Sequence, residues 1–146
     1  MKKVSKSRKT ILWVEDDLFL ISSMLDRFTH HGYEILSAGT ISDALQHLNN
    51  HNSDIDLAIL DVMMPPDTEY LKVDTFDGQR TGLVLGRIIK EKYPKIKIVG
   101  FSVVRDPEVV EWFINYGAGY FTKPILPNDF FQSIEAILYP KRTKKK

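Results

Sequence analysis

The chain has 146 residues, of which 43% are hydrophobic, and a formal net charge of +1 at pH 7. This length suits a single domain with a sizeable core and is too short for two. The chain has no cysteine, which excludes disulfides and thiolate metal sites. No apolar stretch approaches the roughly 20 residues that span a bilayer, so we expect a cytoplasmic protein that does not enter the membrane.

The small net charge hides an uneven distribution. Residues 1–9 contain five Lys or Arg and residues 141–146 contain five more, which leaves ten basic against nineteen acidic residues between them. We interpret 1–9 and 140–146 as basic flexible tails on one acidic domain over residues 10–139. Such tails could touch nucleic acid, but they are short and lack interleaved aromatic residues, so we expect no DNA-binding domain.

The first half of the chain predicts two strand–helix units. An apolar strand over 10–14 precedes a helix over 17–30, in which apolar residues recur at helical spacing. Asp17 is the expected N-cap of that helix. A second strand over 34–38 leads to a helix that begins at Thr40, because Thr with Asp three residues later is similar to a capping box.

The second half predicts three more units of the same kind. The expected strands are Asp56–Leu60, Ile96–Phe101 and Gly119–Thr122, and the expected helices begin at Thr81, at Pro107 behind the cap Asp106, and at Asn128, the last of them ending at Tyr139. Alternating strands and helices predict an α/β fold with a parallel sheet covered by helices on both faces.

Polar residues follow four of the five predicted strands. Glu15 and Asp16 come after the first, Asp61 after the third, Ser102 after the fourth and Lys123 after the fifth. A single acid at a strand end could simply cap the next helix. Four polar ends in one parallel sheet, however, meet at the edge where such sheets bind ligands. Clustered carboxylates also need a neutralising cation, and oxygen ligands suit Mg²⁺.

This ordered set of residues resembles the response-regulator receiver domain of two-component signalling, over residues from about 10 to 139. The resemblance implies a doubly wound, flavodoxin-like sheet with strand order 2-1-3-4-5. It implies a phosphoacceptor signalling domain rather than an enzyme that acts on other molecules. A sensor histidine kinase or a histidine phosphotransfer protein would donate the phosphoryl group to Asp61.

The same resemblance assigns the other site residues. The Mg²⁺ ligands would be Glu15, Asp16, Asp61 and the backbone carbonyl of Met63. Lys123, preceding a cis proline bond, would contact the phosphoryl oxygens, and Ser102 would hydrogen-bond the same group. Ser102 and Tyr120 would form the switch that relays phosphorylation outward. Simpler interpretations stay open: Lys123 as a surface lysine, Ser102 as a local turn cap and Tyr120 as plain core.

The stretch after the phosphoacceptor departs from the family pattern. Asp61 to Pro65 matches the usual Asp-x-x-Met-Pro turn, but an Asp-Gly pair and the third helix should then follow within a few residues. Here the helix is expected at Thr81-Gly82-Leu83, with Asp77-Gly78 as an alternative alignment, so residues 66–80 include about a dozen extra residues. They could form a functional lid or a tolerated surface insertion.

Signal output is expected through the face formed by the fourth helix, the fifth strand and the fifth helix. Aromatic residues at 112, 113 and 116 cannot all point inward from one helix, so this face could bind a downstream protein or a second copy as a homodimer. The alternative function is a degenerate receiver that acts as a phosphorylation-independent interaction module. A haloacid-dehalogenase-type phosphatase is disfavoured, because it needs an aspartate where Met63 stands.

Overall fold

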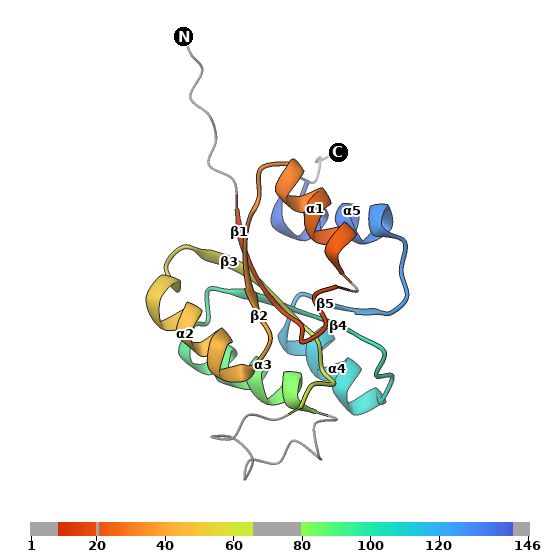
Figure 1. Cartoon of the computed structure of the whole chain (residues 1–146). Helices are drawn as coiled ribbons and strands as arrows, with labels where there is room; N and C mark the ends of the chain where they lie inside the picture. The colour runs from red at the N-terminus through yellow and green to blue at the C-terminus, as the bar shows by residue number, and fades with distance from the viewer. Residues whose placement is uncertain (1–8, 20, 66–79, 142–146) are drawn as a thin grey trace, which may run out of the picture.

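The computed structural model of the chain describes residues 9–19, 21–65 and 80–141. Five parallel strands form one sheet in the order β2-β1-β3-β4-β5 (Figure 1). In chain order the elements are β1 (Thr10–Val14), α1 (Ser22–His30), β2 (Glu34–Ala38), α2 (Ile41–His51), β3 (Ile55–Leu60), α3 (Thr81–Lys92), β4 (Lys97–Ser102), α4 (Pro107–Tyr116), β5 (Gly119–Thr122) and α5 (Pro127–Leu138). The predicted doubly wound α/β fold with order 2-1-3-4-5 is confirmed.

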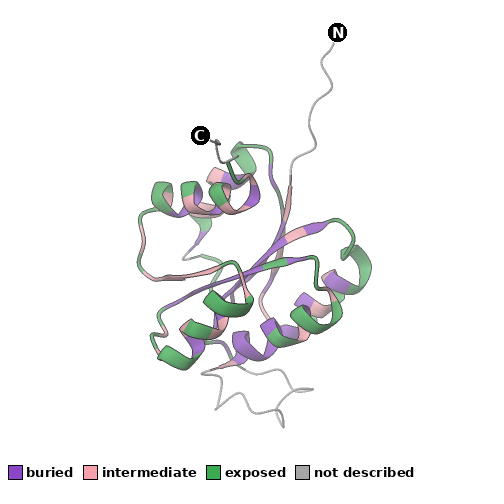
Figure 2. Cartoon of the chain, turned by 180° about the vertical axis from the view of Figure 1, so that it is seen from behind, coloured by how far each residue is buried: buried purple, intermediate pink, exposed green. Residues whose placement is uncertain are grey.

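Helices cover both faces of the sheet. Helices α1 and α5 lie together on one face, and α2, α3 and α4 cover the other (Figure 1). Because side chains alternate along a strand, β1 sends Ile11 and Trp13 to the first face and Leu12 and Val14 to the second. The three central strands and the inward sides of the helices are therefore mostly buried, the edge strands β2 and β5 are mostly half-buried, and the outward sides of the helices are mostly exposed (Figure 2).

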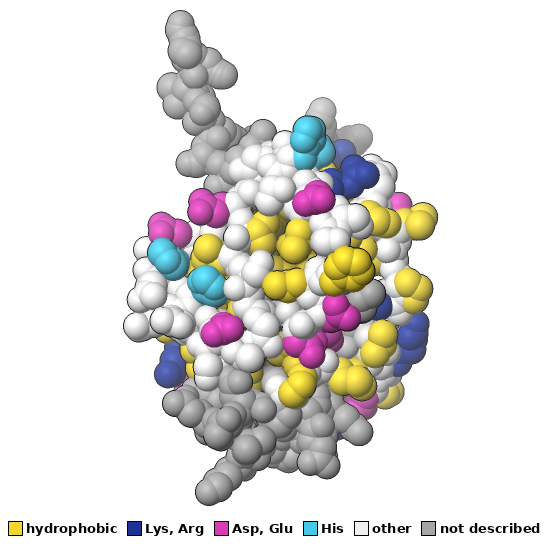
Figure 3. All heavy atoms as spheres, in the orientation of Figure 1, with side chains coloured by type: hydrophobic (Ala, Val, Ile, Leu, Met, Phe, Trp, Pro, Cys, Tyr) yellow, Lys and Arg dark blue, Asp and Glu magenta, His cyan; other side chains and the backbone are white. Residues whose placement is uncertain are grey.

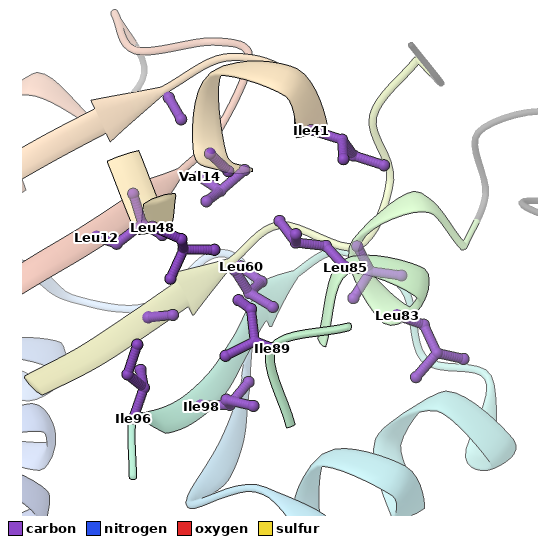
Figure 4. Packing of buried hydrophobic residues seen from close by; sticks show 14 of the residues in the cluster. Leu12, Val14, Ile41, Leu48, Leu60, Leu83, Leu85, Ile89, Ile96 and Ile98 are labelled. Atoms are coloured by element: carbon purple, nitrogen blue, oxygen red, sulfur yellow. The ribbon is translucent and has the colours of Figure 1, made fainter. Parts of the chain in front are cut away.

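The face under α2, α3 and α4 is mainly aliphatic. Figure 4 shows Leu60 of β3 close to Leu48 of α2 and to Ile89 of α3, and all three side chains are fully buried. Burying a leucine or isoleucine side chain contributes about 1.5–3 kcal/mol. This aliphatic layer packs β3, the strand directly before Asp61, against two helices on the same face of the sheet.

The face under α1 and α5 is mainly aromatic. Trp13 meets the edge of Phe28 with ring centroids 5.5 Å apart, and Phe101 of β4 stacks on Phe130 of α5 at 4.3 Å. All four rings are almost completely buried. Aromatic contacts of this kind add to the free energy of burial, so this layer holds β1, β4 and both helices together.

The first helix is shorter than predicted. It begins at Ser22, not at 17, and its N-cap position is Ile21, so the assignment of Asp17 as cap is wrong. The backbone N–H of Asp17 instead donates to the Glu15 carboxylate at 3.1 Å, and the N–H of Ile21 donates to the Leu18 carbonyl. The buried carboxylate of Glu15 therefore holds the chain in turns before the helix can start.

The other predicted boundaries agree with the structure to within one residue, and the other two predicted caps are confirmed. Thr40 accepts a hydrogen bond from the N–H of Asp43, and Asp106 accepts one from the N–H of Glu108 ahead of α4. The expected tails and the extra segment 66–80 lie almost wholly outside the described residues. Among the described helices, none is long and apolar enough to cross a membrane.

The aromatic layer predicts a large cost for removing its central ring. Phe130→Ala should lower the free energy of unfolding by about 3–5 kcal/mol, because the cavity cannot fully collapse between two helices and the sheet. Leu126→Ala, two-thirds exposed just before the same helix, is the control and should change it by less than about 0.5 kcal/mol. Urea unfolding of both variants measures the difference, and equal effects would contradict the packing described.

Candidate functional site

The pairing of the parallel strands determines where the site residues lie. Hydrogen bonds continue one residue past the strand ends: the N–H of Glu15 donates to Ala38, that of Asp61 to Val14, and that of Lys123 to Ser102, each at 2.9 Å. Residues that follow neighbouring strands are thereby fixed side by side. Glu15 and Asp61 leave the sheet together, and Lys123 leaves it beside Ser102.

Three carboxylates come together at this edge. Each of Glu15, Asp16 and Asp61 offers an oxygen that lies within 4.8 Å of the others. Glu15 and Asp61 are buried, with 2% and 7% of their surface exposed, whereas Asp16 is exposed. Figure 3 shows acidic side chains near the centre of the visible face, with hydrophobic side chains beside them. Two of the three carboxylates are therefore buried, and the third faces solvent.

Lys123 bridges the two buried carboxylates. Its Nζ lies 2.5 Å from Glu15 Oε1 and 3.1 Å from Asp61 Oδ2. It also lies 5.3 Å from the centre of the Phe101 ring, which favours the cation further. The Lys123-Pro124 peptide is cis, as the resemblance implied. With all groups ionised, three carboxylates and one ammonium leave two negative charges, the charge that a divalent cation balances.

Burial and charge change the protonation of these groups. Burial raises the pKa of Glu15 to about 7; hydrogen bonding to Lys123 opposes this rise and the charge of Asp61 adds to it. Burial lowers the pKa of Lys123, but its hydrogen bond to Glu15 and the neighbouring carboxylates outweigh burial and raise that pKa above its ordinary value. Without a further cation, burial therefore favours the protonated form of Glu15 over its negatively charged form.

The nucleophile candidate is oriented by its own turn. Asp61 Oδ1 accepts a hydrogen bond from the backbone N–H of Met63 at 3.1 Å, while Oδ2 faces Lys123. Ser102 is fully buried, and its Oγ accepts a hydrogen bond from the N–H of Val104 at 3.3 Å. Ser102 therefore caps a local turn, one of the two roles considered for it, at the end of a strand that leads into the site.

Tyr120 is attached to the same turn. Its hydroxyl donates to the Val104 carbonyl at 2.5 Å, and its ring lies 5.5 Å from that of Phe113. Gly100 of β4 is paired with Tyr120 of β5. A Cβ on Gly100 would come within 2.5 Å of the Tyr120 ring, so the absence of a side chain at this position leaves space for the ring. Burial raises the pKa of Tyr120 to about 12. Tyr120 thus packs partly against the core while its hydroxyl is bonded to the turn after β4, and its role as a switch stays a prediction.

Several contacts at the site were not found by sequence reasoning. Arg80, just before α3, pairs with Asp106 at 2.6 Å and with Glu108 at 2.9 Å, which ties the start of α3 to the start of α4. Gly82 lies against Asp61, and a Cβ there would come within 2.1 Å of the Asp61 carbonyl oxygen. An isolated glycine near a helix start was the only signal available for this contact.

The rim of the site is apolar. Met63 and Val103 come just after Asp61 and Ser102 and are 46% and 54% exposed. Val104, which follows Val103, is half-buried. Apolar groups around a charged centre exclude water and strengthen its electrostatic interactions.

A comparison with protein families agrees with this geometry. The family model described as the response regulator receiver domain matches residues 11–135. The chain therefore belongs to the receiver domain family of response regulators, the family that the ordered polar residues indicated. No curated protein gives a significant match.

Solved structures share the fold. A CheY-like receiver domain protein from Methanospirillum hungatei JF-1 is 24% identical, with a TM-score of 0.73 over 90% of this chain and 94% of its own. The non-phosphorylated HemR receiver domain from Leptospira biflexa is 22% identical, with a TM-score of 0.74 over 94% of this chain and all of its own. A two-component response regulator from Clostridium difficile is 17% identical, with the same TM-score over 93% of this chain and all of its own.

The raised pKa of Glu15 predicts a pH-dependent stability in the absence of metal. Between the ordinary value of 4.5 and the folded value of about 7, the folded state binds more protons than the unfolded state. The contribution of Glu15 to the free energy of unfolding is therefore complete below 4.5 and falls as the pH rises to about 7. Glu15→Gln should gain stability relative to wild type between about pH 5 and about pH 8.

Urea unfolding at several pH values, with a chelator present, measures this gain. Asp17→Asn, at an exposed acid in the same loop, serves as the control for a general effect of charge. A difference between Glu15→Gln and wild type that stays flat across this range would contradict the assignment.

The close approach of Gly82 predicts that a methyl group is not tolerated there. Gly82→Ala should lower the free energy of unfolding by about 1–3 kcal/mol, because the new carbon meets backbone atoms of Asp61 and Val62. Gly39→Ala is a matched control beside Asp16, where the added carbon would make an ordinary contact at 3.9 Å. Denaturant unfolding compares the two, and equal stabilities would show that the Asp61 turn can move freely.

Proposed function

We propose that the chain is a signalling receiver that accepts a phosphoryl group on Asp61 and changes its binding to partners as a result. The observation that carries this proposal is the surroundings of the Asp61 carboxylate. One of its oxygens is held by the Met63 N–H, and the other faces Lys123. Two further carboxylates lie beside it.

The chemistry is a single phosphoryl transfer. An oxygen of Asp61 attacks the phosphorus of the donor, the bond from phosphorus to the donor breaks, and an acyl phosphate remains on the chain. Lys123 is near enough to contact the incoming phosphoryl oxygens as a point charge. Because such a transfer depends on positioning and electrostatics, a rigid pocket with one lysine and an apolar rim suits it.

The acidic cluster fits magnesium. Asp16 would ligate the ion directly and Glu15 through water, while Asp61 and the backbone carbonyl of Met63 complete the protein ligands. All of these donors are oxygen atoms, the ligands that a hard divalent ion prefers. Magnesium bound there would neutralise charge on the transferring oxygens. Glu15, whose carboxylate is buried and hydrogen-bonded to Lys123, would then release Lys123 toward the phosphoryl group.

Phosphorylation would be relayed through the turn after β4. Ser102 and Tyr120 both bond to Val104 in this turn, so movement of Ser102 toward the phosphoryl group would also disturb the Tyr120 hydroxyl. The output face would be α4, β5 and α5, where Ile114 and Tyr116 are more than half exposed. A downstream protein would bind there, or a second copy in a homodimer.

The phosphodonor would be a sensor histidine kinase or a histidine phosphotransfer protein. The chain would modify only itself, so it is proposed as a signalling domain and not as an enzyme. The juxtaposition of Asp61, Glu15 and Lys123 favours this function over an interaction module independent of phosphorylation. A module of that kind has no need to hold a half-buried lysine between two buried carboxylates.

Incubation with acetyl phosphate and Mg²⁺ tests the proposal directly. Intact-mass spectrometry should show the addition of one phosphoryl group to the wild-type chain and none to Asp61→Asn. Asp17→Asn, an exposed acid of the same loop, should be modified like the wild type. Absence of modification in the wild type, or equal modification of Asp61→Asn, would refute the assignment of Asp61.

A further inference from the structure

Thr81 is a buried polar residue that the proposed chemistry leaves without a role. In the described part of the chain four polar or charged residues are buried, and the other three are Glu15, Asp61 and Ser102. Thr81 is the first residue of α3 and is fully buried. Its hydroxyl donates to the carbonyl oxygen of Met64 at 2.5 Å, across 17 positions of sequence.

The next residue makes a second bond to the same turn. The backbone N–H of Gly82 donates to the Val62 carbonyl at 2.9 Å. The start of α3 therefore holds the carbonyls of Val62 and Met64, which lie one residue before and one residue after Met63. A close approach of the two backbones is possible because Gly82 has no Cβ.

These bonds restrain the position of the Met63 carbonyl from both sides. The peptides on both sides of the Met63–Met64 peptide are held, and the Met63 N–H is bonded to Asp61. Displacing the Met63 carbonyl together with the turn would therefore break at least one of these bonds. Leaving the buried Met64 carbonyl without a partner would cost free energy as well.

We propose that Thr81 is a positioning residue that aims the Met63 carbonyl at the metal position and keeps the Asp61 turn in shape. This inference rests on the proposed function, because it assumes that the site binds Mg²⁺. Groups that hold metal ligands in place control metal affinity nearly as strongly as the ligands themselves. Mg²⁺ depends on such support more than Ca²⁺ does, since it requires near-ideal octahedral geometry.

The same bonds bring together the two ends of the extra segment. The chain departs after Met64 and returns at Thr81, and these two residues are hydrogen-bonded to each other. Changes in the length of the chain between them should therefore not alter the conformation of the Asp61 turn, as long as residue 81 keeps its hydroxyl. Thr81 thus allows a long segment to follow the phosphoacceptor without disturbing the site.

The test compares Thr81→Val, which keeps the shape but loses the hydroxyl, with Thr81→Ser, which keeps the hydroxyl. Isothermal titration calorimetry should show that Thr81→Val weakens Mg²⁺ binding about tenfold and Ca²⁺ binding by less than about threefold. Thr81→Ser should bind both ions nearly as wild type does. Saturating Mg²⁺ should restore the phosphorylation rate of Thr81→Val.

Three results would overturn the inference: unchanged Mg²⁺ affinity in Thr81→Val, an equal loss for both ions, or a slow phosphorylation that excess Mg²⁺ does not restore. If Thr81→Val does not fold, Thr81→Cys replaces it. The weak thiol donor should then give a partial loss of Mg²⁺ affinity, and wild-type affinity would overturn the inference.

A second variant examines the extra segment. Replacing residues 67–78 by a short Gly-Ser linker should leave Mg²⁺ affinity unchanged within about twofold, since lengthening or shortening such a connection is tolerated. A loss as large as that of Thr81→Val would contradict the role given to the Thr81 bond. If the wild type itself neither binds Mg²⁺ nor accepts a phosphoryl group, the proposed function fails. If the wild type does both and Thr81→Val binds Mg²⁺ equally well, the proposed function stands and only the positioning role of Thr81 is excluded.

Discussion

The parallel pairing of β1, β3 and β4 is the constraint on which the site depends. A hydrogen bond from Asp61 to the carbonyl of Val14 places two acidic strand ends next to each other, although their residues are far apart in the sequence. The aliphatic layer on one face and the aromatic layer on the other hold this pairing. A slip of one residue in any of these strands would exchange the two faces and separate the carboxylates.

The electrostatic arrangement follows from that geometry. Glu15 and Asp61 are buried because they directly follow buried strands, and burial raises the pKa of Glu15 by disfavouring its negative charge. Lys123 compensates part of it, and a divalent cation would compensate the rest. Burying this negative charge costs free energy when no cation is bound. The same site would therefore suit a divalent cation and a phosphoryl group.

The turns around the site are tied to neighbouring helices and to one another. Thr81 and Gly82 connect the Asp61 turn to α3, and Arg80 connects the start of α3 to the start of α4. Tyr120 connects β5 to the turn after β4. The Asp61 turn is thus bonded to the start of α3, which is in turn bonded to the start of α4.

The sequence by itself determined the chain order of strands and helices and most of their boundaries, because apolar runs, period-3.6 patterns and local caps act over a few residues. It indicated the family as well, because polar residues follow four strands in a characteristic order. It also placed Asp61, Glu15 and Lys123 at strand ends. Tertiary structure decided what depends on distant partners. The hydrogen bond of Glu15 to Asp17 keeps Asp17 from capping α1, which begins only at Ser22. The contact of Gly82 with Asp61 determines where α3 packs against the Asp61 turn. The pairs of Thr81 with Met64 and of Arg80 with Asp106 also form only when the chain folds back on itself, and no local pattern encodes such contacts.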